Sequence, residues 1–157
     1  MNTNKTMSMP IIRKAILKDA PVITGFQVNM AWETEKLALA GETVTSGVNA
    51  VFQNPALGQY WVAEEEGDVV ASLLITFEWS DWRNSWVWWI QSVYVMSEHR
   101  RKGIFRTMYS HIRSEAEKLG IPGLRLYVER NNASAIKTYE SLGMNREHYT
   151  LFEWMKE

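Results

Sequence analysis

The 157-residue sequence contains no cysteine. This absence excludes disulfide bonds, thiolate metal sites and a cysteine nucleophile, so any thiol in a reaction must come from another molecule. The three histidines, His99, His111 and His148, lie far apart, and we expect no metal site. The 17 basic residues nearly balance the 18 acidic ones, so no net field attracts nucleic acid or an anionic membrane.

Long hydrophobic runs are also absent. No stretch approaches the length of a transmembrane helix, and the polar first ten residues lack the apolar core of a secretory signal. We therefore expect a cytoplasmic protein with one domain over residues 1–157, of which 1–9 are flexible. The hydrophobic content of 46% is enough for a core. Neither G-x-x-x-x-G-K-[ST] nor G-x-G-x-x-G occurs, so no NTPase P-loop or dinucleotide fingerprint is available.

The order of strand and helix signals predicts an α/β fold. Apolar runs between turn residues predict strands, and apolar residues at helical spacing predict helices. Strands are expected at 11–17, 60–64, 69–78, 86–95, 124–129 and 147–154, and helices at about 19–39, 43–54, 104–119 and 132–142. The segment from 86 to 129 reads as one right-handed parallel crossover, with hairpins elsewhere.

The stretch from Ser92 to Arg106 runs from an apolar strand through a basic loop into an amphipathic helix. This order predicts a site for a phosphorylated ligand, because backbone N–H groups converge at a helix N-terminus and Gly103 permits close approach. Arg100, Arg101 and Lys102 add positive charge at the same point, as does Arg106. The alternative interpretation is a solvated basic turn, which most Lys/Arg clusters are.

A second motif follows downstream, and together the two resemble the GNAT superfamily of acyl-CoA N-acyltransferases. The family's phosphate loop reads [QR]-x-x-G-x-[GA], which Arg100 and Gly103 match. Its later signature reads N-x-x-A-x-x-x-Y-x-x-x-G-[FY], which is matched by Asn132, Ala135, Tyr139 and Gly143. The sequence departs from the family at Phe105, where a small residue is usual, and at Met144, where an aromatic is usual.

The resemblance implies a single-domain GNAT fold, with a mixed sheet of about six to seven strands flanked by about four helices. In that family the sheet splays between the strands that correspond here to 86–95 and 124–129, and the pantetheine arm of acetyl-CoA lies in the gap. The arm would pair with backbone near Val93, Tyr94 and Val95. The pyrophosphate would bind the loop that continues into Ile104 and Phe105, and Asn132 and Ala135 would face the cofactor. Homodimers are common in the family.

Acyl transfer to an amine needs a neutral amine, a stabilised carbonyl oxygen and a protonated leaving thiolate. Tyr139 suits the last role, because a tyrosine hydroxyl with a reference pKa of about 10 is a proton donor at neutral pH. Packing alone is the alternative for Tyr139, and an N-cap role is the alternative for Asn132. A backbone N–H of residues 93–95 is expected to stabilise the oxygen.

The 86–95 strand contains no acidic residue or histidine, so a general base from the middle of this strand is excluded. Glu78 is the first candidate, followed by Glu33 and Asp81, and a water chain to a carboxylate is an equal alternative. Trp79 and Trp82, with Glu33 and Asp81, would form a site for a cationic amine through cation–π and ion-pair contacts. A large buried core is the alternative reading of these tryptophans.

The leading functional hypothesis is an acetyl-CoA-dependent N-acetyltransferase that acts on the primary amine of a small molecule by direct attack in a ternary complex. One alternative keeps the reaction and makes the acceptor a protein N-terminus or lysine. Another is a non-catalytic acyl-CoA-binding module, which would have no need of the Tyr139 hydroxyl.

Overall fold

The computed structural model describes residues 9–156, and the expected flexibility of residues 1–9 falls, apart from Met9, outside this range. The described chain divides after Arg125 into two compact units. The first holds a sheet and three α-helices, and the second holds one α-helix, α4, at Ala133–Ser141. No described helix is both long enough and apolar enough to cross a bilayer.

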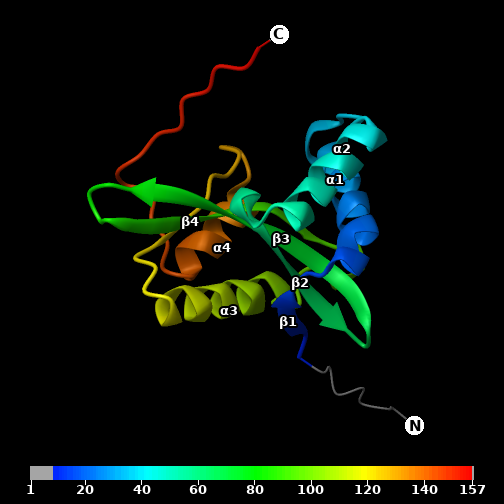
Figure 1. The fold of residues 1–157 in the computed structure, drawn as a ribbon, viewed down its shortest axis with the longest axis horizontal. Coiled ribbons are helices and arrows are strands. Elements are labelled where there is room, and N and C mark those ends of the chain that lie inside the picture. Colours follow the sequence, from blue (N-terminus) through cyan, green and yellow to red (C-terminus); the bar gives the residue numbers. More distant parts are fainter. Residues whose placement is uncertain (1–8, 157) are drawn as a thin grey trace. The chain divides into compact units, whose positions relative to one another are not determined.

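The first unit is built on a five-stranded mixed sheet with the strands in sequence order (Figure 1). The strands are β1 (Ile11–Lys14), β2 (Gln59–Glu65), β3 (Asp68–Ser80), β4 (Ser85–Val95) and β5 (Leu124–Arg125). Neighbouring strands are antiparallel except β4 and β5, which are parallel. The connection from β4 to β5 passes through α3 (Ile104–Lys118), as the sequence predicts for a parallel crossover.

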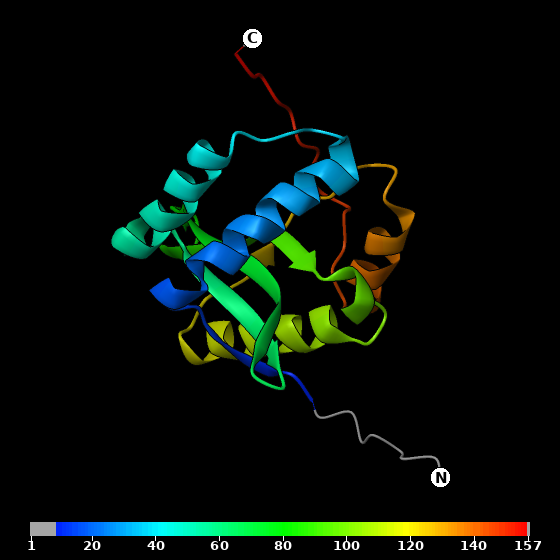
Figure 2. The same ribbon diagram turned by 90° about the vertical axis from the view of Figure 1, so that its right-hand side faces the viewer.

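Helices cover both faces of this sheet (Figures 1 and 2). Because side chains alternate along a strand, Val62 of β2 points to the face covered by α1 (Ala20–Glu35) and α2 (Gly41–Gln53). Its neighbour Trp61 points to the face covered by α3, which turns a buried stripe spaced by four residues toward the sheet: Ile104, Met108, Ile112 and Ala116. We call these the α1 face and the α3 face.

Gly58 fixes the approach of the chain to β2. Its φ is +150°, and a Cβ atom there would lie 2.6 Å from the backbone oxygen of Ile75 on β3. Only glycine permits such close contact, so the turn from α2 into the sheet depends on this residue.

Most predicted elements are present, but the strand predicted at 147–154 is wrong. These residues form neither strand nor helix, and Tyr149, Phe152 and Trp154 are 77%, 91% and 85% exposed. The strand predicted at 124–129 pairs with β4 only over Leu124–Arg125. Since the 147–154 segment adds no strand, the sheet has five strands rather than six to seven. An apolar, β-prone sequence becomes a strand only where a neighbour exchanges backbone hydrogen bonds with it.

Two further boundaries differ from the sequence prediction by three residues or more. β1 ends at Lys14 rather than at residue 17, and Leu17–Asp19 forms a 3₁₀ turn. α1 ends at Glu35 rather than at residue 39, because Lys36 adopts a left-handed conformation with φ +55°.

Arg13 ties the first strand to the start of α1. Its guanidinium donates to Asp19 at 2.8 and 3.1 Å and to Glu64 of β2 at 2.9 Å. Asp19 is buried and also accepts from the N–H of Ile16 at 2.8 Å. The Arg13 guanidinium, helped by that N–H, holds the pKa of Asp19 below its usual range.

We therefore predict that Asp19→Asn destabilises the fold by roughly 1.5–3 kcal/mol at neutral pH, the range for a hydrogen bond to a charged partner. A carboxyl whose folded pKa is depressed contributes stability above its unfolded pKa and loses it as the pH falls. Urea denaturation of the wild type should thus show stability declining below about pH 4, and the variant should show a shallower decline. Glu117→Gln, which removes an exposed pair with Arg113, is the control and should change little. Equal stability of Asp19→Asn and wild type would contradict the role of Arg13.

Candidate functional site

Within residues 9–156, no strand pairs with the second half of β4 on the side away from β3, and we call this side the open edge. β4 pairs with β3 along most of its length, but β5 pairs only with Trp88 and Trp89. The N–H of Met96 donates to the oxygen of Val70 on β3 at 2.9 Å. Because successive residues of an antiparallel strand turn their backbone groups to opposite sides, those of Val95 point away from β3, toward the open edge. An extended ligand could pair with this edge as an added strand does.

A β-bulge interrupts β4 just before this edge. Ser72 of β3 lies opposite Tyr94 and Leu74 lies opposite Gln91, so one residue of β3 faces both Ser92 and Val93. Ser92 adopts φ +51°, which is uncommon for a residue other than glycine. The extra residue reverses the alternation, so that Tyr94 points to the α1 face rather than to the α3 face with Trp88. No glycine or proline marks the bulge, so the sequence alone does not predict it.

The displaced Tyr94 meets two charged residues predicted to lie in the site. Its hydroxyl donates to Glu33 of α1 at 2.8 Å, and the other oxygen of Glu33 accepts from Arg100 at 2.5 Å. Arg100 also donates to the carbonyl of Val95 at 2.8 Å and lies over the Tyr94 ring, 5.4 Å from its centre. Arg100, followed by the Tyr94 hydroxyl, lowers the pKa of Glu33. Burial, together with Glu33, raises the pKa of Tyr94.

This cluster shows that Arg100 holds the loop to α1 and β4. Glu33 was expected to bind an amine or act as a base, but both of its oxygens are engaged by Tyr94 and Arg100. Arg100 was expected at the phosphates, but its guanidinium is turned onto Glu33 and Val95. Of Tyr94 and Val95, Tyr94 turns its backbone groups to β3 and Val95 turns them to the open edge.

The loop between β4 and α3 fits an anionic ligand through its backbone. A 3₁₀ turn at Ser97–His99 is fixed by His99, whose Nδ1 lies 2.6 Å from a carboxylate oxygen of Glu65. Arg101 (φ +60°) and Gly103 (φ +77°) then adopt left-handed conformations and lead into α3. A Cβ atom on Gly103 would meet nothing within 4 Å, so space is open in front of the helix N-terminus.

The first N–H groups of an α-helix have no acceptor within the helix, and its dipole favours an anion at this end. Gly103 precedes the first turn, which contains Ile104, Phe105 and Arg106. Ile104 is buried, and the Phe105 ring is half-buried with its centre 6.4 Å from that of Tyr109. Arg101 and Lys102 are exposed. The arrangement suits a phosphate bound by backbone groups with exposed positive charge nearby.

The predicted base Glu78 and the predicted acceptor-binding residue Trp79 lie on different faces of the β3–β4 hairpin. Glu78 lies on the α1 face, where it accepts from Arg125 of β5 at 2.5 Å and from the Trp89 indole at 2.8 Å. Trp79 lies on the α3 face, with its ring centre 5.2 Å from that of Trp86, and is 50% exposed. Adjacent residues of one strand cannot share a face, so Glu78 and Trp79 are not brought together.

Asp81 and Trp82 occupy the turn that joins β3 and β4. The Trp82 N–H donates to the Asp81 carboxylate at 2.9 Å, and the Trp82 ring is 89% exposed. No motif in the sequence points to Arg125 or Gln91 as site residues. Gln91 donates to Thr76 at 2.6 Å on the α1 face. Only the register of β4 against its neighbours reveals that these side chains share a face with Glu78.

The second motif forms α4 in the second unit. Asn132 is the N-cap, and its side-chain oxygen accepts from the N–H of Ala135 at 3.1 Å. Tyr139 follows Ala135 by one turn, so the two share a side of the helix. Tyr139 is half-buried, and burial raises the pKa of its hydroxyl. The hydroxyl is therefore protonated at neutral pH, as a proton donor must be.

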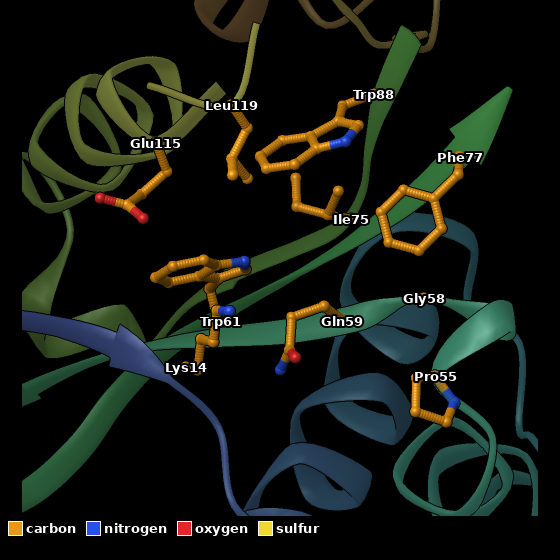
Figure 3. Close-up of a pocket in the computed structure, with 10 residues that line it drawn as sticks. All are labelled: Lys14, Pro55, Gly58, Gln59, Trp61, Ile75, Phe77, Trp88, Glu115 and Leu119. Atoms are coloured by element: carbon orange, nitrogen blue, oxygen red, sulfur yellow. The ribbon is translucent and has the colours of Figure 1, made fainter. Parts of the chain in front are cut away.

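A cavity of about 180 Å³ lies on the α3 face and contains none of the predicted site residues. Its aromatic walls are Trp61, Phe77 and Trp88, which surround Ile75 at its centre (Figure 3). Glu115 and Leu119 close it from α3. Within residues 9–156, no group of three or more His, Cys, Asp or Glu side chains is arranged to hold a metal ion.

Comparison with known proteins agrees with the resemblance. The sequence profile described as "Acetyltransferase (GNAT) family" matches residues 27–144. The chain belongs to this family, and it carries the family's fold. A crystal structure described as a possible acetyltransferase from Clostridium difficile 630 has a TM-score of 0.87 and 42% identity, and the match covers 96% of this chain and 99% of that one.

Two curated relatives match shorter segments. Phosphinothricin N-acetyltransferase of Streptomyces viridochromogenes is 30% identical over 84 residues, which are 53% of this chain and 45% of the relative. The [ribosomal protein bS18]-alanine N-acetyltransferase of Escherichia coli K12 is 41% identical over 54 residues, 34% of this chain and 36% of the relative. The matched segments thus span less than half of either relative.

We predict that Glu33→Gln loosens the loop more than it destabilises the fold. The Glu33–Arg100 pair is 39% and 43% exposed, so the cost in folding free energy should stay below about 1 kcal/mol. Amide hydrogen exchange at residues 97–103 should nevertheless become faster, because the anchor of Arg100 is lost. Glu117→Gln in α3 is the control and should leave exchange in the loop unchanged. Loop exchange as slow as in the wild type would show that Glu33 does not hold the loop.

Proposed function

We propose that this protein is an acetyl-CoA-dependent N-acetyltransferase that acts on the primary amine of a small molecule. The observation that carries the proposal is the continuous path from the open edge at Val95, through two left-handed residues, to the N-terminus of α3. It offers a strand edge for an extended amide arm and a helix N-terminus for a pyrophosphate. Membership of the GNAT family and the names of both curated relatives support N-acetyl transfer, and the name of one of them, phosphinothricin N-acetyltransferase, supports a small-molecule acceptor.

In this proposal the loop binds the cofactor mainly through backbone groups. The N–H groups around Gly103 and Ile104 hold the pyrophosphate, and Arg101, Lys102 and Arg106 add charge at the surface. Val93 and Val95 pair with the pantetheine arm. Since Arg100 already occupies the Val95 carbonyl, it positions the edge rather than contacting phosphate. Asn132 and Ala135 contact the cofactor from α4.

Acetyl-CoA supplies a thioester, whose acetyl carbon forms the new bond to the neutral amine nitrogen as its bond to sulfur breaks. The Val95 N–H is the proposed donor to the carbonyl oxygen, since the register turns it to the open edge. The Tyr139 hydroxyl donates its proton to the leaving sulfur, a role that its raised pKa is compatible with. Glu78 is the proposed acceptor of the proton from the amine, directly or through water.

A protein N-terminus is the second candidate acceptor. This candidate is supported by the 41% identity, over 54 residues, to an enzyme whose name gives an alanine of ribosomal protein bS18 as the acetylated residue. The two candidates are separated by measuring thiol release from acetyl-CoA with a panel of small amines and a panel of peptides. Turnover confined to peptides would overturn the small-molecule assignment, and no thiol release with any acceptor would overturn the enzymatic one.

We predict that Gly103→Asp greatly weakens CoA binding relative to Gly103→Asn. The two side chains are nearly equal in size, both tolerate φ +77° better than other residues do, and space is open for either. Only aspartate places a negative charge beside the pyrophosphate, so we expect its affinity by calorimetry to be at least about tenfold lower than that of the asparagine variant. Equal affinities would show that the pyrophosphate lies elsewhere.

We predict that Tyr139→Phe lowers kcat by roughly 10²–10⁴-fold, the scale for loss of a general acid. The ring is retained, so CoA affinity should remain close to that of the wild type. Steady-state kinetics and calorimetry on the same preparation separate the two effects. An unchanged kcat would show that solvent, and not Tyr139, protonates the leaving thiolate. A loss of CoA affinity as large as the loss of kcat would show that the hydroxyl acts in binding.

A further inference from the structure

The Glu78–Arg125 pair joins opposite charges on the α1 face of the sheet. Glu78 of β3 accepts from Arg125 of β5 with one oxygen, at 2.5 Å, and from the Trp89 indole of β4 with the other, at 2.8 Å. Three neighbouring strands therefore fix these side chains. Because Trp89 lies opposite both Thr76 and Arg125, all of them share one face.

The place of the pair in the sheet is specific. Trp89 and Arg125 form the last pair of residues between β4 and β5. Beyond them begins the open edge of β4, which leads through the bulge to Val95. The pair therefore lies at the start of the open edge, whose further part at Val93 and Val95 the proposed function gives to the thioester arm. Thr76 and Gln91 add polar side chains on the same face.

Both partners are accessible, since the Glu78 and Arg125 side chains are 40% and 28% exposed. A simple cationic amine could pair with Glu78 but would have to compete with the Arg125 guanidinium for the carboxylate. A molecule with an ammonium and an acidic group matches both charges, because its ammonium replaces Arg125 on Glu78 and its anion replaces Glu78 on Arg125.

We propose that Glu78 and Arg125 together recognise a zwitterionic acceptor, a primary amine that carries a carboxylate or a similar acidic group a few bonds away. The planar guanidinium suits such an anion, since it can donate two parallel hydrogen bonds to two oxygens. Arg125 thereby determines specificity, and the acceptor class is narrowed from amines in general to amino acids and their analogues. This inference rests on the proposed acetyl transfer.

The test compares amino acids with the matching amino-acid amides and decarboxylated amines, which keep the amine and lose the anion. Thiol release is measured for the wild type, Arg125→Gln, Arg125→Lys and Arg113→Gln, and binding of the same compounds is measured by calorimetry. The wild type should favour the acids by about 10–100-fold in kcat/KM and in affinity, the range expected for one charge-assisted contact. Arg125→Gln should lose this preference through a higher KM for the acids, so that its kcat/KM values for acids and matching amides become nearly equal.

Arg125→Lys keeps a positive charge beside Glu78, so the variant should still fold and should keep part of the preference for acids over amides. Arg113→Gln removes an exposed arginine of α3, on the other face, and should behave like the wild type. The inference is overturned if the wild type treats acids and amides alike, or if Arg125→Gln lowers both equally, as a purely structural ion pair would. If the acids bind through Arg125 but no amine yields thiol, the recognition stands and the proposed acetyl transfer fails.

Discussion

One extra residue in β4 sets the geometry of the candidate site. The bulge at Ser92 and Val93 reverses the side-chain alternation, and Tyr94 moves to the face covered by α1. There its ring packs on Phe26, with centres 5.0 Å apart, and its hydroxyl reaches Glu33. Without the bulge, Tyr94 would point toward α3, and Glu33 would lose one of its two partners. The contact of Tyr94 with α1 thus depends on the bulge, at which Ser92 is left-handed.

The charges of the basic loop have different roles despite their proximity in sequence. Arg100 is held by Glu33 and by the carbonyl of Val95, and it covers the Tyr94 ring. It is therefore an internal support, although a motif match alone assigns it to the ligand. Arg101 and Lys102 remain exposed, and the left-handed residues before α3 leave the approach to its N-terminus open. In the proposed function, the anion is therefore bound chiefly by backbone N–H groups.

The long β3–β4 hairpin separates two kinds of surface that the sequence interleaves. On the α3 face, aromatic pairs follow one another from Phe77 and Trp88, which line the cavity, to Trp79 and Trp86 near the tip. On the α1 face, Glu78 pairs across the sheet with Arg125. The dense cluster of tryptophans therefore does not form one pocket with the neighbouring acids. The alternation of side chains along a strand is enough to predict this separation. The pairing of Glu78 with Arg125, by contrast, depends on the parallel register of β5 against β4.

The sequence by itself determined the class of fold, the order of most elements and the motif that joins β4 to α3, because these depend on local periodicity and on residues close in the chain. It also carried the family signature around Asn132 and Tyr139. The tertiary structure alone decided the bulge at Ser92, the use of Arg100 and the partner of Glu78. It also decided that the β-prone segment at 147–154 forms no strand. Each of these depends on pairing between residues distant in sequence, and neither hydrophobic pattern nor propensity encodes which backbone or charge will lie opposite.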